Sequence, residues 1–292
     1  MTKPLSHTSM LVYLSQRAWK ATAVDHEVSA YMEQSYSAES GTMTAIKALC
    51  PKEIIQPIQR AMRLGRAQHY LLTTPGLFRG QHLLSTAMFE TYAQTQQAIK
   101  DEFESRVRDF LSIYPKIVRN AARLGNAYKM EDFPDENSIK TFFEYTLQYQ
   151  PVPDMSDWRM DGVDAEQVDA IRREAEEGVN AMYRKATEEV YTRAREVLEK
   201  LYNQATNYSL DAPGAMLRDA TIEHIKEISS LVSSMNISGD PTLDYVGQQM
   251  LKEFSELKGK ELRADVNRRS EVAAKAQKIL ARLNGASHKR AA

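Results

Sequence analysis

The sequence predicts a mainly helical α+β fold, in which long antiparallel helical rods dominate and a small β element lies in the N-terminal half. Residues 163–204 contain no proline and one glycine. Their apolar residues recur in steps of three and four, as on one face of a helix. This stripe comprises Val168, Ile171, Ala175, Val179, Met182, Ala186, Val190, Ala194, Val197 and Leu201. A second stripe over residues 86–114 predicts another long helix, and alternating aromatic residues at 141–152 predict a strand.

The first third of the chain predicts two short strands and two helices. Residues 10–16 are a short apolar segment that fits a strand or an apolar anchor, and residues 42–50 fit a strand. Between them, Asp25 is placed to cap a helix that ends near Tyr36. Pro51 stands where a helix can begin, because the first turn of a helix needs no backbone N–H at that position.

The middle of the chain predicts a turn, the second long helix and the clearest strand. Residues 74–84 contain Pro75, Gly76 and Gly80, which favour a turn or a short hairpin. The helix over residues 86–114 is expected to kink or end at Pro115 and to stop by Gly125. In residues 141–152 aromatic and polar side chains alternate with the period of a half-buried strand.

The last third predicts a long rod followed by shorter helices. A Pro- and Asp-rich linker at residues 151–162 is expected to separate a mixed helical domain, 1–150, from a C-terminal part, 163–292. A rod of about 60 Å at 1.5 Å per residue cannot cover its own stripe. We expect it to pack against the 86–114 helix or against the same helix of another subunit.

Three helices are expected after the rod. Apolar spacing predicts one over residues 217–235 and a last one over 271–283. Asp240 and Pro241 have the residue types preferred at the start of the helix between them.

Composition limits the function classes. The 292 residues carry 38 basic and 39 acidic side chains, so the chain as a whole does not attract polyanions. No apolar run approaches the ~20 residues that span a bilayer, and the N-terminus lacks a secretory signal. A single cysteine, Cys50, excludes an internal disulfide framework. We expect a cytoplasmic protein without membrane association, and Cys50 as a buried apolar residue, with a reactive thiol as the alternative.

Motifs for catalysis are missing. The sequence contains neither GxxxxGK[ST] nor GxGxxG, and its six histidines lie far apart without an HExxH pair. We therefore predict no enzyme: no catalytic, no cofactor-binding and no metal-binding residues. His69 is the one candidate general base, with a structural histidine as the favoured interpretation. Asp154, Asp157 and Asp161 resemble a spaced Mg²⁺-binding set, but loop and helix capping explain them as well.

The C-terminal region is locally basic. Residues 252–290 contain eleven Lys or Arg residues and five acids, an excess of six positive charges. Such a cluster can contact phosphates, although a solvated helix face is equally natural. The candidate nucleic-acid contacts are Arg263, Arg268, Arg269, Lys275, Lys278 and Arg282.

Several segments occur in a familiar order. They are LSQRAWKATAVDHEV, KALCPKEIIQPI, RAQHYLLTTPGLFRGQHLLSTAMFETY, FLSIYPKIV, YQPVPDMSDWRM and SSLVSSMNISGDPTLDYV. From about residue 10 to 283 the chain resembles a family of bacteriophage and prophage proteins known as a domain of unknown function. The resemblance implies a helical cytoplasmic protein. Some members are encoded near MoxR-type AAA+ ATPases and von Willebrand factor A-type proteins, and no family active site can be carried over.

These observations predict a non-enzymatic bacteriophage protein in the cytoplasm of the infected bacterium. It would act through helical surfaces as an adaptor or assembly component. Its expected partner is a protein, either an AAA+ ATPase or a host factor, and it is expected to form homo-oligomers. One alternative is a single-strand DNA-binding or recombination accessory protein. Another is an inhibitor of a host defence enzyme.

Overall fold

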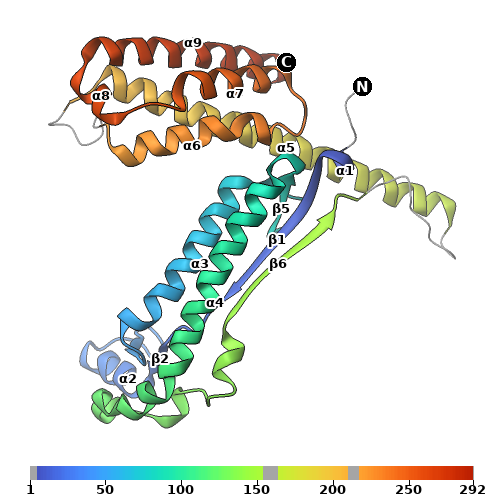
Figure 1. Ribbon diagram of the computed structural model, residues 1–292. Coiled ribbons are helices and arrows are strands. Elements are labelled where there is room, and N and C mark those ends of the chain that lie inside the picture. Colours follow the sequence, from blue (N-terminus) through green and yellow to red (C-terminus); the bar gives the residue numbers. More distant parts are fainter. Residues whose placement is uncertain (1–4, 154–163, 210–216, 292) are drawn as a thin grey trace. The chain divides into compact units, whose positions relative to one another are not determined.

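The computed structural model describes residues 5–153, 164–209 and 217–291 (Figure 1). The described chain is mainly helical and contains a small antiparallel sheet formed largely from its N-terminal half, as the sequence predicts. None of the described helices is both long and apolar enough to cross a membrane.

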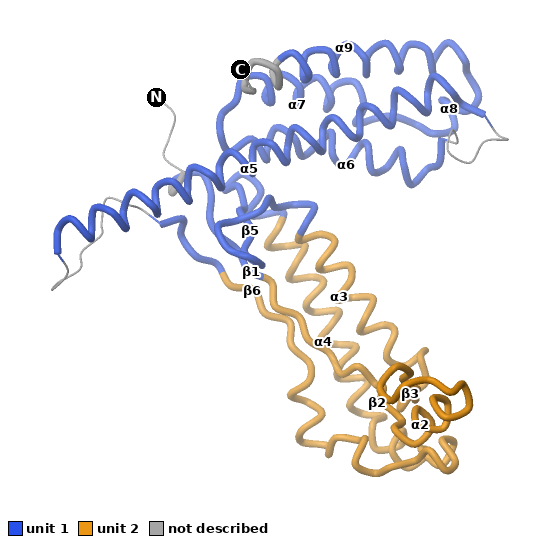
Figure 2. The backbone as a smooth tube through the Cα atoms, turned by 180° about the vertical axis from the view of Figure 1, so that it is seen from behind, with its two compact units in different colours: residues 1–13, 70–91, 149–292 blue, residues 14–69, 92–148 orange. Residues whose placement is uncertain are grey.

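The chain divides into two compact units, coloured separately in Figure 2. Unit 1 comprises residues 1–13, 70–91 and 149–292, and unit 2 comprises residues 14–69 and 92–148. This differs from the expected division into 1–150 and 163–292. The physical reason is that early strands pair with one another and share a core with the long helix, so residues far apart in sequence fold as one unit.

The core of unit 1 is a four-helix bundle. It is formed by α5 (Ala165–Thr206), α6 (Asp219–Met235), α7 (Pro241–Phe254) and α9 (Val266–Ala291), with the short α8 (Gly259–Ala264) before α9. α5 packs against α6 and α9, and α7 also packs against α6 and α9, so the four helices form a closed ring. Figure 1 shows the chain running back and forth through the bundle, the up-and-down arrangement that short connections favour.

The C-terminal part of the long helix buries its apolar stripe inside this bundle, where Ala194 and Leu201 are fully buried. Earlier in the helix, Met182 and Ala186 belong to a core shared with Leu11 and Leu83 of the strands. Within the chain this helix packs against α9, with α6 beside it, whereas the sequence predicted either the 86–114 helix or the same helix of another subunit. The expectation rested on matching stripe length, whereas α9 and α6 bring apolar faces of their own to α5 within the same unit. These faces include Ile222, Ile225, Val232, Val272, Ala276, Ile279 and Leu283.

The start of α7 follows the predicted chemistry. Asp240 accepts hydrogen bonds from the backbone N–H groups of Thr242 and Leu243, and Pro241 occupies the first helical position. Further along α7, Gly247 lies against α6: a Cβ there would stand 2.3 Å from Ser233 Oγ. Only glycine permits this close approach of the two helices.

A four-stranded antiparallel sheet contains β1 (Ser9–Arg17), β4 (Thr74–Pro75), β5 (Gln81–Ser85) and β6 (Glu144–Pro151), in the order β4-β5-β1-β6. Within unit 1, β1 pairs with β5 from Ser9↔Ser85 to Tyr13↔Gln81. The strands predicted at 10–16 and 141–152 and the hairpin at 74–84 are confirmed. The short α1 (Leu5–Thr8) precedes β1, and the 3₁₀ turn η1 (Thr86–Met88) follows β5.

Unit 2 is built on most of α3 (Lys52–Leu72) and α4 (Phe89–Arg119). The second helix begins as predicted and continues through Pro115 to Arg119. Of the two outcomes expected at this proline, a kink or an end, the end is therefore wrong. Tyr114 and Ile117 are buried on either side of Pro115, and their packing holds the helix together where one backbone hydrogen bond is missing. Three short 3₁₀ segments follow: η2 (Asn120–Ala127), η3 (Met130–Asp132) and η4 (Ile139–Phe142).

A buried polar ladder fixes α3 against α4. Gln96 on α4 donates to the backbone oxygen of Gly65 on α3 at 3.0 Å and accepts from the Tyr145 hydroxyl at 2.5 Å. One helical turn further on, His69 Nδ1 lies 2.7 Å from the Tyr92 hydroxyl. These contacts only fit in one register of the two helices, because a shifted register would bury the same groups without partners.

Candidate protein-interaction site

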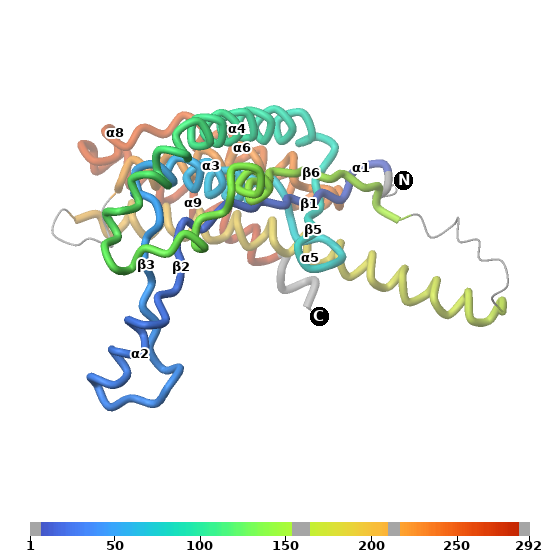
Figure 3. Tube along the Cα trace, turned by 90° about the horizontal axis from the view of Figure 1, so that it is seen from below, coloured from blue at the N-terminus to red at the C-terminus, as the bar shows by residue number. Residues whose placement is uncertain are grey.

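Unit 2 carries a projecting module that we name the finger, residues 22–48. It consists of β2 (Thr22–Asp25), α2 (His26–Ser35), a loop, and β3 (Ala45–Ala48). β2 and β3 form an antiparallel two-stranded ribbon, with Val24 opposite Ile46. Figure 3 shows α2 and its loop extending on this ribbon away from the rest of unit 2.

The interior of the finger is polar. Ser29 and Glu33 form the buried side of α2. Glu33 Oε1 accepts hydrogen bonds from the backbone N–H groups of Gly41 at 2.7 Å and Met43 at 3.0 Å. Ser29 Oγ donates to the Asp25 carbonyl and accepts from the Ala45 N–H. Hydrogen bonds to one serine and one carboxylate therefore hold the loop and β3 on the helix, in place of an apolar core.

The exterior of the finger carries five large apolar side chains. On α2, Tyr31 is 70% exposed and Val28 is 44% exposed, and Tyr36 just beyond the helix is 75% exposed. On the ribbon, Ile46 is 67% exposed and its cross-strand partner Val24 is 42% exposed. Single exposed apolar residues are common, but a set of large ones on a small module makes a candidate interaction surface.

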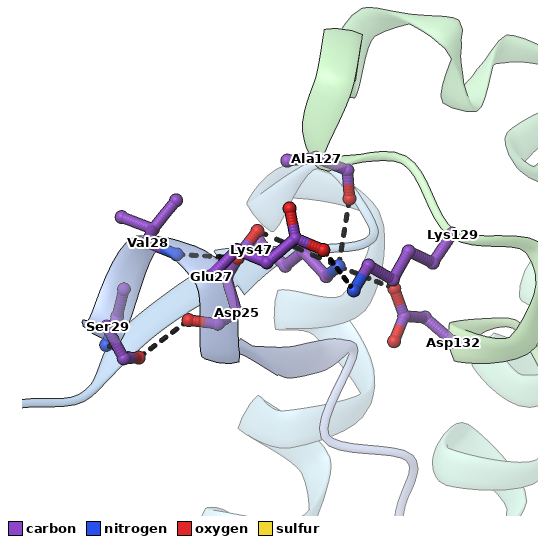
Figure 4. Close-up of polar contacts among 9 residues, drawn as sticks. Asp25, Glu27, Val28, Ser29, Lys47, Ala127, Lys129 and Asp132 are labelled. Carbon is purple, nitrogen blue, oxygen red and sulfur yellow. Dashed lines mark hydrogen bonds and ion pairs between the residues drawn. The ribbon is translucent and has the colours of Figure 1, made fainter. Parts of the chain in front are cut away.

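A buried lysine fixes the base of the finger (Figure 4). Lys47 Nζ on β3 donates to the Ala127 carbonyl at 2.8 Å and lies 2.8 Å from Asp132 Oδ2 and 3.9 Å from Asp25 Oδ2. Its side chain is 7% exposed. Because a buried ammonium group requires compensation, the two carboxylates and the carbonyl fix β3 against η2 and η3.

A second, exposed ion pair lies beside the first. Lys129 Nζ is 2.9 Å from Glu27 Oε1, and this contact raises the pKa of Lys129. The Val28 amide, followed by Lys47 and Lys129, holds the pKa of Asp25 below its ordinary value. Asp25 is thus both the predicted cap of α2 and one of the two carboxylates beside Lys47 at the base of the finger. The sequence indicated only the first role.

Apolar side chains continue onto the segment that holds the base. Met130 is 75% exposed, and Tyr128 is partly exposed with its ring 6.0 Å from that of Phe133. Both residues lie between Ala127 and Asp132, the two contacts of Lys47 on this segment. Lys47 therefore connects this segment to the finger through Ala127 and Asp132.

This inverted arrangement was not predicted from the sequence. Val28, Tyr31 and Met32 would ordinarily be assigned to the buried face of α2, because apolar residues usually face inward. The sign available in the sequence is weak: Ser29 and Glu33 stand four residues apart, a spacing that places both on one helix face.

The six predicted nucleic-acid contacts are placed on α8 and α9, and most of them have partners in the protein. Arg263 pairs with Asp219, Arg268 with Glu271, and Lys275 with both Glu253 and Glu271. Carboxylates of the protein therefore already pair with three of the six cations that the sequence assigned to nucleic-acid binding.

The other three predicted contacts, Arg269, Arg282 and Lys278, have no ion pair among the described residues. Arg269 donates to the carbonyls of Leu262 and Arg263 and lies 4.6 Å from the centre of the Tyr208 ring. Arg282 lies 5.7 Å from the centre of the Tyr245 ring. Lys278 is exposed. The set does not form one free cationic face.

Of the residues considered for catalysis, His69 is the one that the structure describes. Asp154, Asp157 and Asp161 lie outside the described residues. His69 is buried and bonded to Tyr92, the structural arrangement favoured from the sequence. Within the described parts of the chain, no group of three His, Cys, Asp or Glu residues is placed to hold a metal ion.

Cys50 is buried in the core of unit 2, as expected. Burial raises the pKa of its thiol to about 11, so the reactive thiolate is scarce at neutral pH.

Unit 1 has an uncovered surface on α5. From residue 165 to 181 the helix has no fully buried residue, whereas Met182 and most of the later stripe are buried. An apolar groove of about 520 Å³ runs along this part of α5, against Leu77 and Phe78. Its α5 side includes Ile171, Ala175, Gly178, Val179 and Met182.

No protein-family model matches this chain, and no curated protein or solved structure is significantly similar to it.

Proposed function

We propose that this protein is a non-enzymatic adaptor or assembly component that binds a protein partner through the finger. The observation that carries the proposal is the inverted construction of this module. Ser29 and Glu33 face inward, while Val28, Tyr31 and Tyr36 face the solvent. Stability alone favours the opposite arrangement, so a partner that covers the apolar side chains accounts for it.

An adaptor needs a second surface, and α5 offers one in the other unit. Its first turns carry the N-terminal part of the apolar stripe outside the bundle, with Ile171 38% exposed. We propose that this part of α5 supports self-association, in line with the homo-oligomer expected from the sequence. Light scattering across micromolar concentrations tests it, with Ile171→Glu expected to shift the mass toward the monomer. A monomeric mass at all concentrations would contradict this part of the proposal.

The family resemblance suggests where the partner is found. It supports a role in the cytoplasm of an infected bacterium, with an AAA+ ATPase or a host factor as the protein bound. An inhibitor of a host defence enzyme would use the same kind of surface. The identity of the captured partner distinguishes the two roles.

The test compares three tagged forms of the full chain used to capture partners from bacterial lysate. The finger variant is Tyr31→Ser/Tyr36→Ser/Ile46→Thr. The matched control changes three exposed apolar residues elsewhere: Leu64→Ser/Leu251→Ser/Val266→Ser. The expected result is a partner retained by the wild type and the control but lost by the finger variant.

The captured partner is then purified and its dissociation constant measured with each form. We expect the finger variant to bind at least about a hundredfold more weakly, since three central aromatic or aliphatic contacts are removed. Equal binding by all three folded forms would refute the finger as the docking surface.

A further inference from the structure

The outer face of α3 carries a straight line of polar and basic side chains. Lys52, Gln56, Gln59, Arg63 and Arg66 follow one another in steps of four and three. This spacing places them along one line of a helix, over about 20 Å at 1.5 Å per residue. Lys52, Arg63 and Arg66 are exposed, and the two glutamines are partly exposed.

Arg60 lies next to this line and is also exposed. We name Lys52, Arg60, Arg63 and Arg66 the α3 cations. All four belong to unit 2. The only acid on α3 is Glu53, adjacent to Lys52 in sequence and therefore turned about 100° from it around the helix.

The α3 cations differ from several cations on other helices, which have a carboxylate partner on their own helix. Arg106 on α4 pairs with Glu102, and Arg193 on α5 pairs with Glu189. Among the residues that the structure describes, none of the α3 cations lies within ion-pair distance of a carboxylate. Their charge is therefore available to an external anion, unlike that of Arg263, Arg268 and Lys275.

We propose that the α3 cations bind the phosphate backbone of a single-stranded nucleic acid. Three of the four are arginines, whose planar guanidinium groups make paired hydrogen bonds to phosphate oxygens. Gln56 and Gln59 lie between cations and offer amide groups to the same ligand. A single row of positive charge matches one strand, whereas a duplex presents two.

An acidic protein partner is less favoured because this line contains no apolar side chain. Protein interfaces normally have a desolvated apolar or aromatic centre with charges at the rim. A polyanion needs no such centre, because release of its counterions drives binding.

The test is fluorescence anisotropy with the full chain and a labelled single-stranded oligodeoxynucleotide of mixed sequence, between 50 and 200 mM salt. Four phosphate contacts predict a slope of log K against log salt of about −3. Arg60→Gln/Arg63→Gln/Arg66→Gln should reduce the slope to about −1 and weaken binding at 50 mM salt by about tenfold or more. Arg60→Lys/Arg63→Lys/Arg66→Lys keeps the positive charge and should keep most of the slope of log K against log salt.

The matched control removes three cations of the C-terminal set: Arg268→Gln/Lys278→Gln/Arg282→Gln. It should bind like the wild type. The finger variant should do the same, which separates this proposal from that of the protein partner. All substituted side chains are at least partly exposed, so thermal unfolding should change little.

The absence of binding by the wild type at 50 mM salt would overturn the proposal, as would equal binding by the wild type and the α3 glutamine variant. A loss of binding confined to the C-terminal control would instead favour the helices first expected from the sequence. Stronger binding to a duplex of the same sequence, or to poly-glutamate of equal charge, would assign the α3 cations to a different ligand.

Discussion

The bundle of unit 1 and the finger of unit 2 are built in opposite ways. In the bundle, α5 turns Ala194, Leu198 and Leu201 inward. In the finger, α2 turns Ser29 and Glu33 inward and leaves Tyr31 exposed. The bundle gains stability from buried apolar area, at roughly 25 cal/mol per Å². The finger keeps its apolar area outside, and hydrogen bonds and ion pairs hold it in place.

This difference indicates where each region can be changed. A bundle residue is constrained by the space around it, so substitutions act on the stability of the fold. An outward residue of the finger is constrained by what it contacts outside the chain, so its substitution should act on binding. The five predictions below test this contrast, beginning with the largest expected effect.

Ala194→Glu should destabilise unit 1 by on the order of 4 kcal/mol. Ala194 is completely buried among neighbouring side chains. A carboxylate at this position would therefore be buried without a partner. Chemical denaturation followed by circular dichroism measures the change. Ile46→Glu on the finger is the control, since its side chain is 67% exposed. A loss of similar size in both variants would contradict the contrast.

Lys47→Met should release the base of the finger. The substitution leaves the carboxylates of Asp25 and Asp132 close together and poorly solvated, at a cost of about 3 kcal/mol. Hydrogen exchange of amides in residues 22–48 measures the opening. Lys129→Met breaks the exposed pair with Glu27 and should change exchange only slightly. Undiminished protection in Lys47→Met would show that the ion pairs do not hold the finger.

Cys50 should report the opening of unit 2 separately from unit 1, because it is the only cysteine in the chain and lies in the core of unit 2. Reaction with a thiol reagent at pH 8 should be at least about a hundredfold slower in the native than in the denatured protein. Ala194→Glu should leave this rate nearly unchanged if the units open independently. Equal acceleration by Ala194→Glu and Lys47→Met would show that they open together.

The same thiol gives a pH dependence of definite sign. Burial raises its pKa from 9.0 to about 11, so the folded state favours the neutral thiol. This contribution is complete below pH 9 and is lost as the pH rises toward 11. Cys50→Ala should therefore reduce the fall in stability over this interval. An unchanged alkaline profile would mean that the thiol is not buried in solution.

Tyr31→Ser and Tyr36→Ser should have the smallest effect on stability, within about 0.5 kcal/mol. Both rings are at least 70% exposed, so their removal leaves no cavity. Thermal unfolding checks this expectation alongside the capture experiment. A large loss of stability would mean that these rings support the finger and are not a docking surface.

Local patterns predicted much of the secondary structure. The stripe of α5, the cap at Asp240 and the alternation in β6 each depend on neighbouring residues, and all three are present in the structure. The continuation of α4 through Pro115 was not predictable in this way. A proline costs about 3 kcal/mol in a helix interior, and only the packing of Tyr114 and Ile117 can offset that cost.

The candidate sites were less accessible from the sequence than the fold. Counting charges pointed to the C-terminal helices, but counting cannot show that Arg263 meets Asp219, which lies 44 residues earlier. The same limit hid the α3 cations, because their significance lies in the absence of a nearby carboxylate among the described residues. Charges become available or neutralised through distances, and distances between remote residues are a tertiary property.

By itself the sequence determined the fold class, most helices and strands and the burial of Cys50, because periodicity, capping and turn residues act over a few positions. Tertiary structure alone decided that α9 and α6 cover α5, that early strands join unit 1, and that α2 exposes Tyr31 to solvent. Each of these outcomes depends on which apolar and charged surfaces meet in space. Several partners were compatible with the α5 stripe, and only the folded chain selects between them.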